Sequence, residues 1–102
     1  FQARLAEFGT SPIVGEARGV GLIGALEIVI DKSTRDQYPP EVKAGAQIAA
    51  AALAKGLIVR ALPGDVIGIC PPLIITKEQI DELFDALASA VDDTANILKQ
   101  AA

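Results

Sequence analysis

The chain has 102 residues, which is the size of one small domain. Its formal net charge of -4 argues against a nucleic-acid-binding protein, because such proteins normally carry a basic patch. Its apolar runs are short and are broken by Gly, Pro or charged residues, so none predicts a membrane span. No charged leader precedes an apolar stretch, and we therefore expect a cytoplasmic protein without a secretory signal.

The residue types exclude several kinds of catalytic site. There is no histidine, and the only cysteine is Cys70, which argues against a zinc site and excludes an internal disulfide and a Ser-His or Cys-His couple. Cys70 lies in an apolar run, which predicts a buried structural thiol. The segment "GVGLIG" lacks the Lys-Ser/Thr of a phosphate-binding loop and the glycine spacing of a dinucleotide site. The chain is therefore a binding or structural domain, or one part of an enzyme whose other residues lie elsewhere.

The first half of the chain predicts a helix, a strand and a second helix. Residues 1–8 have apolar side chains at helical spacing, with Gly9 as the stop. Residues 20–30 alternate between a fully apolar face and a face of small and mixed residues, as expected for a strand that is covered on one side. After a polar connection, residues 41–55 predict an alanine-rich helix that Gly56 caps in a left-handed conformation.

The second half predicts a hairpin and a final helix. Residues 57–62 and 66–70 form two strands joined by a type II turn at Pro63-Gly64, which Asp65 closes. Thr76 and Gln79 form a capping box at the start of the last helix. Its apolar stripe consists of Ile80, Leu83, Phe84, Leu87, Val91 and Leu98, and the acidic residues Glu78, Asp81, Glu82 and Asp85 are expected to form a solvated face that suits the helix dipole.

These elements predict an α+β fold for residues 1–102 as a single domain. We expect a small sheet of three or more strands that includes an antiparallel hairpin, with helices on one face. The periodicity leaves open how the long strand at residues 20–30 joins the hairpin.

Three segments, taken together and in order, resemble the C-terminal small domain of class III aminotransferases, in particular the ω-transaminase branch. They are "EARGVGLIGALEIV" (16–29), "GLIVRALPGDVIGICPPLIIT" (56–76) and "IDELFDALASAVDDT" (80–94). The resemblance implies a domain of a pyridoxal-phosphate enzyme of fold type I that works as a homodimer. Such enzymes move an amino group between an amine or amino acid and a keto acid or aldehyde.

The resemblance also implies that the cofactor is bound by a large domain outside this sequence. The Schiff-base lysine and the phosphate-binding groups belong to that large domain, so no catalytic or cofactor-binding residue is assigned here and the chain is expected to be inactive alone. The five lysines, Lys32, Lys43, Lys55, Lys77 and Lys99, are expected to be surface charges.

The resemblance implies a functional role for one residue. The arginine after the "GLIV" strand of ω-transaminases moves inward to pair with a substrate carboxylate and outward for a hydrophobic amine, and this position is Arg60. A guanidinium suits the task because it is always charged and binds a carboxylate through two parallel hydrogen bonds. Acetylornithine-type relatives place a fixed carboxylate-binding arginine about where Gly68 falls, which leaves Arg60 as the local candidate. Pro63 makes the loop after Arg60 one residue longer than in "RALGD", the commonest form of this motif in the family.

Other positions have structural interpretations. Arg18 is expected to hold the start of the strand or the contact with the large domain, and Glu27 is expected to be a paired structural carboxylate. Pro71, Pro72 and Leu73 are expected to shape the rim of the pocket. The alternative to the enzyme is a non-catalytic α+β domain for ligand sensing or dimerisation.

Overall fold

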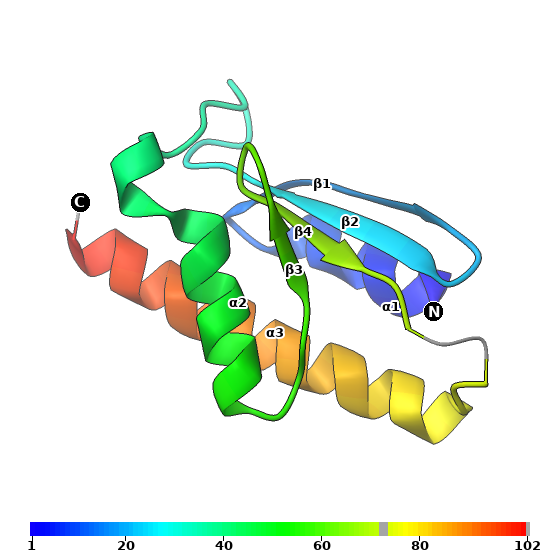
Figure 1. Ribbon diagram of the computed structural model, residues 1–102. Helices are drawn as coiled ribbons and strands as arrows, with labels where there is room; N and C mark the ends of the chain where they lie inside the picture. The colour runs from blue at the N-terminus through cyan, green and yellow to red at the C-terminus, as the bar shows by residue number, and fades with distance from the viewer. Residues whose placement is uncertain (72–73, 102) are drawn as a thin grey trace.

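A computed structural model describes residues 1–71 and 74–101, with side chains described in 1–71 and 74–99. Its elements follow in the order α1 (Gln2–Glu7), η1 (Phe8–Thr10), β1 (Val14–Val20), β2 (Ile23–Ile28), η2 (Pro40–Val42), α2 (Ala44–Ala54), β3 (Arg60–Leu62), β4 (Val66–Ile69) and α3 (Lys77–Ala101). The four strands form one antiparallel sheet in the order β1-β2-β4-β3. The predicted α+β class, with an antiparallel hairpin in a small sheet, is therefore confirmed (Figure 1).

The helices pack on one face of the sheet, as predicted. Alternate residues of β2 and β4, among them Leu26 and Ile67, point to this face and are fully buried. They share one core with Leu5 of α1, Ile48 of α2 and Phe84 of α3. Burial of these apolar side chains is the main stabilising term of the fold. No helix in the described part of the chain is long and apolar enough to cross a membrane.

The predicted strand at residues 20–30 is wrong in its extent. The chain turns at Gly21-Leu22, so that β1 runs antiparallel to β2 and Val20 faces Ile23. Gly21 has φ +58°, which suits the first central position of a two-residue type II′ hairpin turn. Apolar alternation continues through the turn and conceals it, which is why β1 was missed.

The predicted helix at residues 41–55 begins later than expected. Residues Pro40–Val42 form a 3₁₀ turn, and Lys43 takes a left-handed conformation (φ 54°) that separates this turn from α2. The predicted end is confirmed. Gly56 has φ +83°, its N–H donates to Leu53 O (3.0 Å), and the Leu57 N–H donates to Ala52 O (2.9 Å), as in a Schellman motif.

The predicted start and apolar stripe of α3 are confirmed. The Thr76 N–H donates to Gln79 Oε1 (3.0 Å) and the Gln79 N–H donates to Thr76 Oγ1 (3.2 Å), which completes the capping box. Four stripe residues are buried and two are half-buried. The buried residues are Phe84, Leu87, Val91 and Leu98, and the half-buried ones are Ile80 and Leu83.

Candidate functional site

The candidate site lies on the face of the sheet opposite the helices. The strand register places Arg18 beside Ala25, Ala25 beside Gly68, and Gly68 beside Arg60, in one row across all four strands. Side chains of one row point to the same face, and the neighbouring row, which includes Leu26, points to the core. The row therefore presents two arginines to the open face, with two very small residues between them.

A hollow of about 440 Å³ lies on this face beside Arg60. Ala25 and Gly68 line it, together with Ile23, Ile58 and Cys70. Most of this lining is apolar, so Arg60 supplies the only charged side chain among the described residues that line the hollow. Such a combination of apolar surface and one polar anchor is typical of small-molecule sites.

Arg60 is the first residue of β3, an edge strand, and its side chain is exposed. The chain has four arginines. Three of them form ion pairs, whereas Arg60 forms none with any carboxylate in the described part of the chain. The three paired arginines are Arg4, Arg18 and Arg35. The Arg60 guanidinium therefore has its hydrogen-bond donors available for an anion.

The loop after β3 is fixed by a contact with α2. The predicted turn geometry at Gly64 is supported by its φ of +83°, and Asp65 follows with a left-handed φ of 57°. Asp65 Oδ1 accepts a hydrogen bond from the Gly45 N–H (3.0 Å), which lies in the first turn of α2. A Cβ at Gly45 would lie 3.2 Å from Asp65 Cα, so the glycine permits this close approach. Asp65 thus caps the helix as well as closing the turn, and it anchors the loop after β3 to α2.

Arg18 and Glu27 form an ion pair on the open face. Arg18 Nη1 donates to Glu27 Oε2 and also contacts Glu16, which lies opposite Glu27 across the strands. The side-chain interaction with Glu16 and the nearby Arg18 guanidinium hold the pKa of Glu27 below its ordinary value of 4.5. The prediction that Glu27 is a paired carboxylate is confirmed, and Arg18 holds β1 to β2.

Cys70 corrects one prediction. It was expected to be buried, but its side chain is exposed and lines the hollow beside Arg60. Strand alternation explains the difference, because Ile69 takes the inward position at the end of β4 and the next residue points outward. Of the predicted pocket-rim segment, Pro71 is half-buried, while Pro72 and Leu73 lie outside the described residues.

The lysines do not contribute to this site. All five are exposed, as predicted, and none of them lines the hollow beside Arg60. A Schiff base with pyridoxal phosphate needs a lysine amine close to the reacting substrate. No lysine among the described residues lines the hollow, so the hollow by itself offers no such amine.

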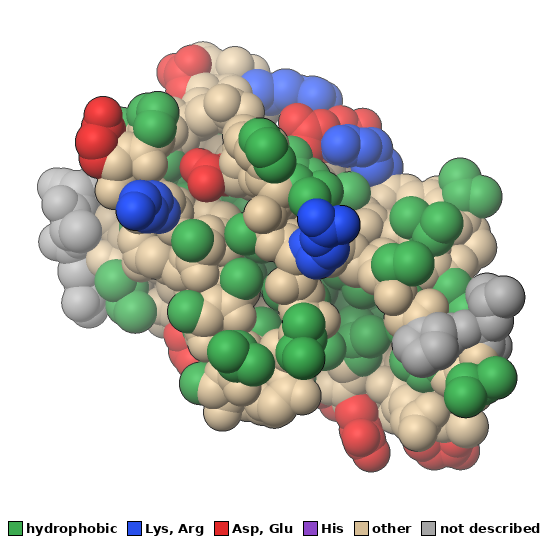
Figure 2. All heavy atoms as spheres, in the orientation of Figure 1, with side chains coloured by type: hydrophobic (Ala, Val, Ile, Leu, Met, Phe, Trp, Pro, Cys, Tyr) green, Lys and Arg blue, Asp and Glu red, His purple; other side chains and the backbone are tan. Residues whose placement is uncertain are grey.

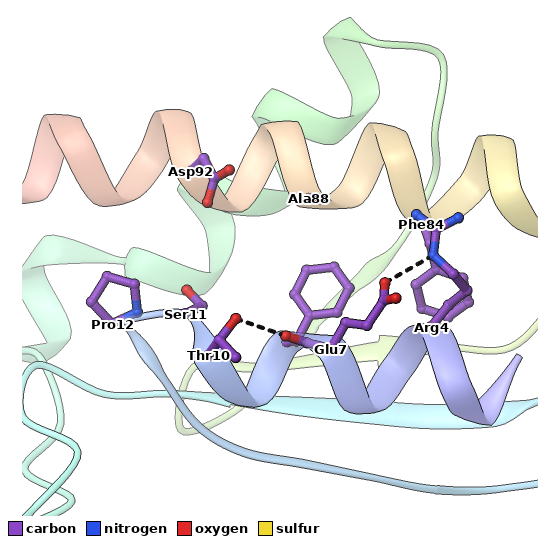
Figure 3. Close-up of a pocket in the computed structure, with 9 residues that line it drawn as sticks. Arg4, Glu7, Thr10, Ser11, Pro12, Phe84, Ala88 and Asp92 are labelled. Atoms are coloured by element: carbon purple, nitrogen blue, oxygen red, sulfur yellow. Dashed lines mark hydrogen bonds and ion pairs between the residues drawn. The ribbon is translucent and has the colours of Figure 1, made fainter.

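A second hollow, of about 240 Å³, lies between α1 and α3 (Figure 3). Arg4 stands at its edge and donates to Asp81 Oδ1 (2.9 Å) and Asp85 Oδ1 (2.6 Å) of α3, and to Glu7 of its own helix. The hydrogen bond to Asp85 is the main reason that the pKa of Arg4 is raised. Two of the acidic residues expected to be only solvated thus join α3 to α1. The only sequence signal was their i,i+4 spacing on one helix face.

Comparison with known proteins identifies relatives of the chain. A family model described as "Aminotransferase class-III" matches residues 1–91. The chain is 42% identical over 94 residues to a diaminobutyrate–2-oxoglutarate transaminase of Halomonas elongata, covering 91% of this chain and 20% of that protein. The chain spans about a fifth of the length of the curated relatives it matches.

Solved structures support the same relationship. An omega-transferase from Vibrio fluvialis superposes with a TM-score of 0.93 at 36% identity, covering 96% of this chain and 23% of that one. A PLP-bound aminotransferase mutant from Vibrio fluvialis superposes with a TM-score of 0.90 at 36% identity, covering 93% and 21%. These matches favour the enzyme over the non-catalytic alternative.

Proposed function

Because the chain belongs to the class-III aminotransferase family, we propose that it is part of a pyridoxal-phosphate-dependent transaminase in which Arg60 binds the carboxylate of an amino-acid or keto-acid substrate. The observation that carries the role of Arg60 is its isolation. It borders an apolar hollow on the open face and has no ion-pair partner among the described residues.

The chemistry of the hollow suits both substrate classes of a transaminase. A carboxylate that enters an apolar hollow loses water, and a charge-assisted bidentate contact with a guanidinium offsets that loss. A neutral amine has no carboxylate and needs only the apolar lining, provided that Arg60 turns away. The flexible stem of an exposed arginine on an edge strand allows this movement.

The remaining parts of the enzyme belong to the protein outside this chain. They are the lysine and phosphate-binding groups for pyridoxal phosphate, and the rest of the substrate pocket. The enzyme works as a homodimer in the cytoplasm, so a second subunit is also part of it. The open face offers a surface for such a neighbour, since Val20, Ile23 and Ile58 are 82%, 63% and 82% exposed. Figure 2 shows hydrophobic side chains at the surface where the tip of the β1-β2 hairpin and the end of β4 lie in Figure 1. The domain thereby closes one side of the pocket.

The test is the variant Arg60→Ala in the full-length enzyme, with the two half-reactions measured separately. We expect kcat/KM for the acid to fall about 10- to 100-fold, because a hydrogen bond to a charged group contributes about 1.5–3 kcal/mol. The reaction of a neutral arylalkyl amine should change little. Arg60→Lys should restore part of the acid reaction, since an ammonium lacks the planar fork. Equal losses for acid and amine would refute the role of Arg60.

A further inference from the structure

We propose that Gly68 is a specificity-determining residue, because its missing side chain leaves Arg60 the space to bind a substrate carboxylate. This inference rests on the proposed function of Arg60 and goes beyond it. It names a second residue, on a neighbouring strand, whose size sets the preference for acids over neutral amines.

Gly68 is the direct cross-strand neighbour of Arg60. The two residues are register partners in the β3-β4 pair, and both line the hollow on the open face. A Cβ added at Gly68 would lie 3.9 Å from Arg60 Cβ and 3.2 Å from Leu62 Cδ1. Any larger side chain there would stand on the open face between Arg60 and Ala25, where the hollow lies.

The backbone does not explain this glycine. The glycines with positive φ in the described residues are Gly21, Gly56 and Gly64, which form turns and a helix cap, and Gly68 is not among them. Glycine weakens a strand because it has no side chain to pack and loses more backbone entropy than other residues. A β-branched residue would suit the strand better. Glycine inside a strand often marks a bulge or a place where a ligand or another backbone approaches closely, and the register at Gly68 has no bulge.

The contacts of the missing Cβ point to the same conclusion. Its nearest neighbours are the side chains of Leu62 and Arg60, both on β3, rather than any backbone atom of an opposing element. The Leu62 side chain would have to shift by a few tenths of an ångström to admit this Cβ, but no rigid backbone contact requires glycine at this position. Without a side chain at Gly68, Arg60 gains room to lie across β4 toward the hollow. A carboxylic acid whose carbon chain occupies the apolar lining could then meet the guanidinium.

The test compares Gly68→Ala and Gly68→Val in the full-length enzyme, with the acid and amine half-reactions measured separately. We expect the ratio of kcat/KM for acid to kcat/KM for neutral amine to fall about two-fold for Ala and about ten-fold for Val, because crowding weakens one charge-assisted contact. Gly9→Ala is the matched control, since Gly9 is exposed and nothing lies within 4 Å of its added Cβ. This control should leave the ratio unchanged.

A double variant separates crowding of Arg60 from a general distortion of the hollow. In an Arg60→Ala background, Gly68→Val should cause no further fall in the ratio, because the group that it crowds is gone. An equal fall for acid and amine, or a fall that persists without Arg60, would overturn the proposal. If melting curves show that Gly68→Val does not fold, the Gly68→Ala ratio, with and without Arg60, decides.

The same measurements separate this inference from the proposed function. If Arg60→Ala lowers the ratio and the Gly68 variants do not, the role of Gly68 is wrong and that of Arg60 stands. If Arg60→Ala itself leaves the ratio unchanged, the proposed function fails, and the role of Gly68 fails with it.

Discussion

Arg60 differs from the other arginines of the chain in its surroundings rather than in its chemistry. Arg4 joins two helices through Asp81 and Asp85, and Arg18 joins two strands through Glu27. Arg60 has no such partner in the described residues and borders an apolar hollow. Of these cations, Arg60 is the one whose donors are left for a ligand.

Asp65 carries a prediction at the same scale. Its carboxylate accepts the Gly45 N–H at the start of α2 and its backbone takes a left-handed φ. We expect Asp65→Ala to lower the stability of the enzyme by about 1–2 kcal/mol, from the lost cap and from strain in an alanine at positive φ. Asp65→Asn keeps an acceptor oxygen and tolerates this φ, so it should lose less than half as much. Equal losses in melting temperature for the two variants would contradict the capping role.

At the scale of elements, local signals in the sequence predicted most of the fold. Three boundaries of elements were predicted correctly because each depends on residues close in sequence. They are the capping box at Thr76, the helix cap at Gly56 and the turn at Pro63-Gly64. The β1-β2 hairpin was missed because apolar alternation runs through Gly21 without a break. The contact between Arg4 and Asp81 joins residues that are 77 positions apart, so the spacing of the aspartates on α3 could not identify their partner on α1.

The candidate site was predictable only in part. The role of Arg60 was predicted from a family resemblance. That Arg60 has no ion-pair partner among the described residues depends on where the fold places the carboxylates, which the sequence alone does not show. The exposure of Cys70 depends on which face of β4 is covered, which the sequence does not state. The register that sets Gly68 beside Arg60 likewise depends on the pairing of two strands.

The ion pair between β1 and β2 predicts that the stability of the fold depends on pH. The pKa of Glu27 is lowered in the folded state, so its ionised form stabilises the fold at neutral pH. This contribution is fully present above the ordinary value of 4.5 and is lost as the pH falls through the lowered folded pKa. Because the pair is partly exposed, we expect the effect to be below about 1 kcal/mol.

The measurement is the fall in melting temperature between about pH 6 and about pH 3 for the wild type and for Glu27→Gln. The fall should be smaller in the variant, whereas Glu41→Gln, at an exposed glutamate outside the described ion pairs, should behave as the wild type. Identical pH profiles for Glu27→Gln and the wild type would rule out this contribution.

At the scale of the whole molecule, the two faces of the sheet have different roles. One face forms the core with three helices, and the other presents Arg60, the hollow and exposed apolar side chains. Surfaces of this kind usually meet another part of a protein or a ligand. The chain spans about a fifth of its curated relatives, so we expect the rest of the enzyme to cover this face.

The chain alone should therefore not catalyse transamination. The 102-residue chain, mixed with pyridoxal phosphate and an amine, should give no keto product, because none of its exposed lysines lines the hollow. The measurement is cofactor absorbance together with product formation. Turnover at enzymatic rates would show that a reactive lysine lies within the chain itself.

The central claim is that Arg60 binds the substrate carboxylate, and the most direct measurement is a structure of the full-length enzyme with an unreactive carboxylic acid bound. We expect two Arg60 guanidinium nitrogens to lie about 2.7–2.9 Å from the two carboxylate oxygens, with the carbon chain against the apolar lining of the hollow. A structure in which other groups hold the carboxylate, while Arg60 points to solvent, would contradict this role of Arg60.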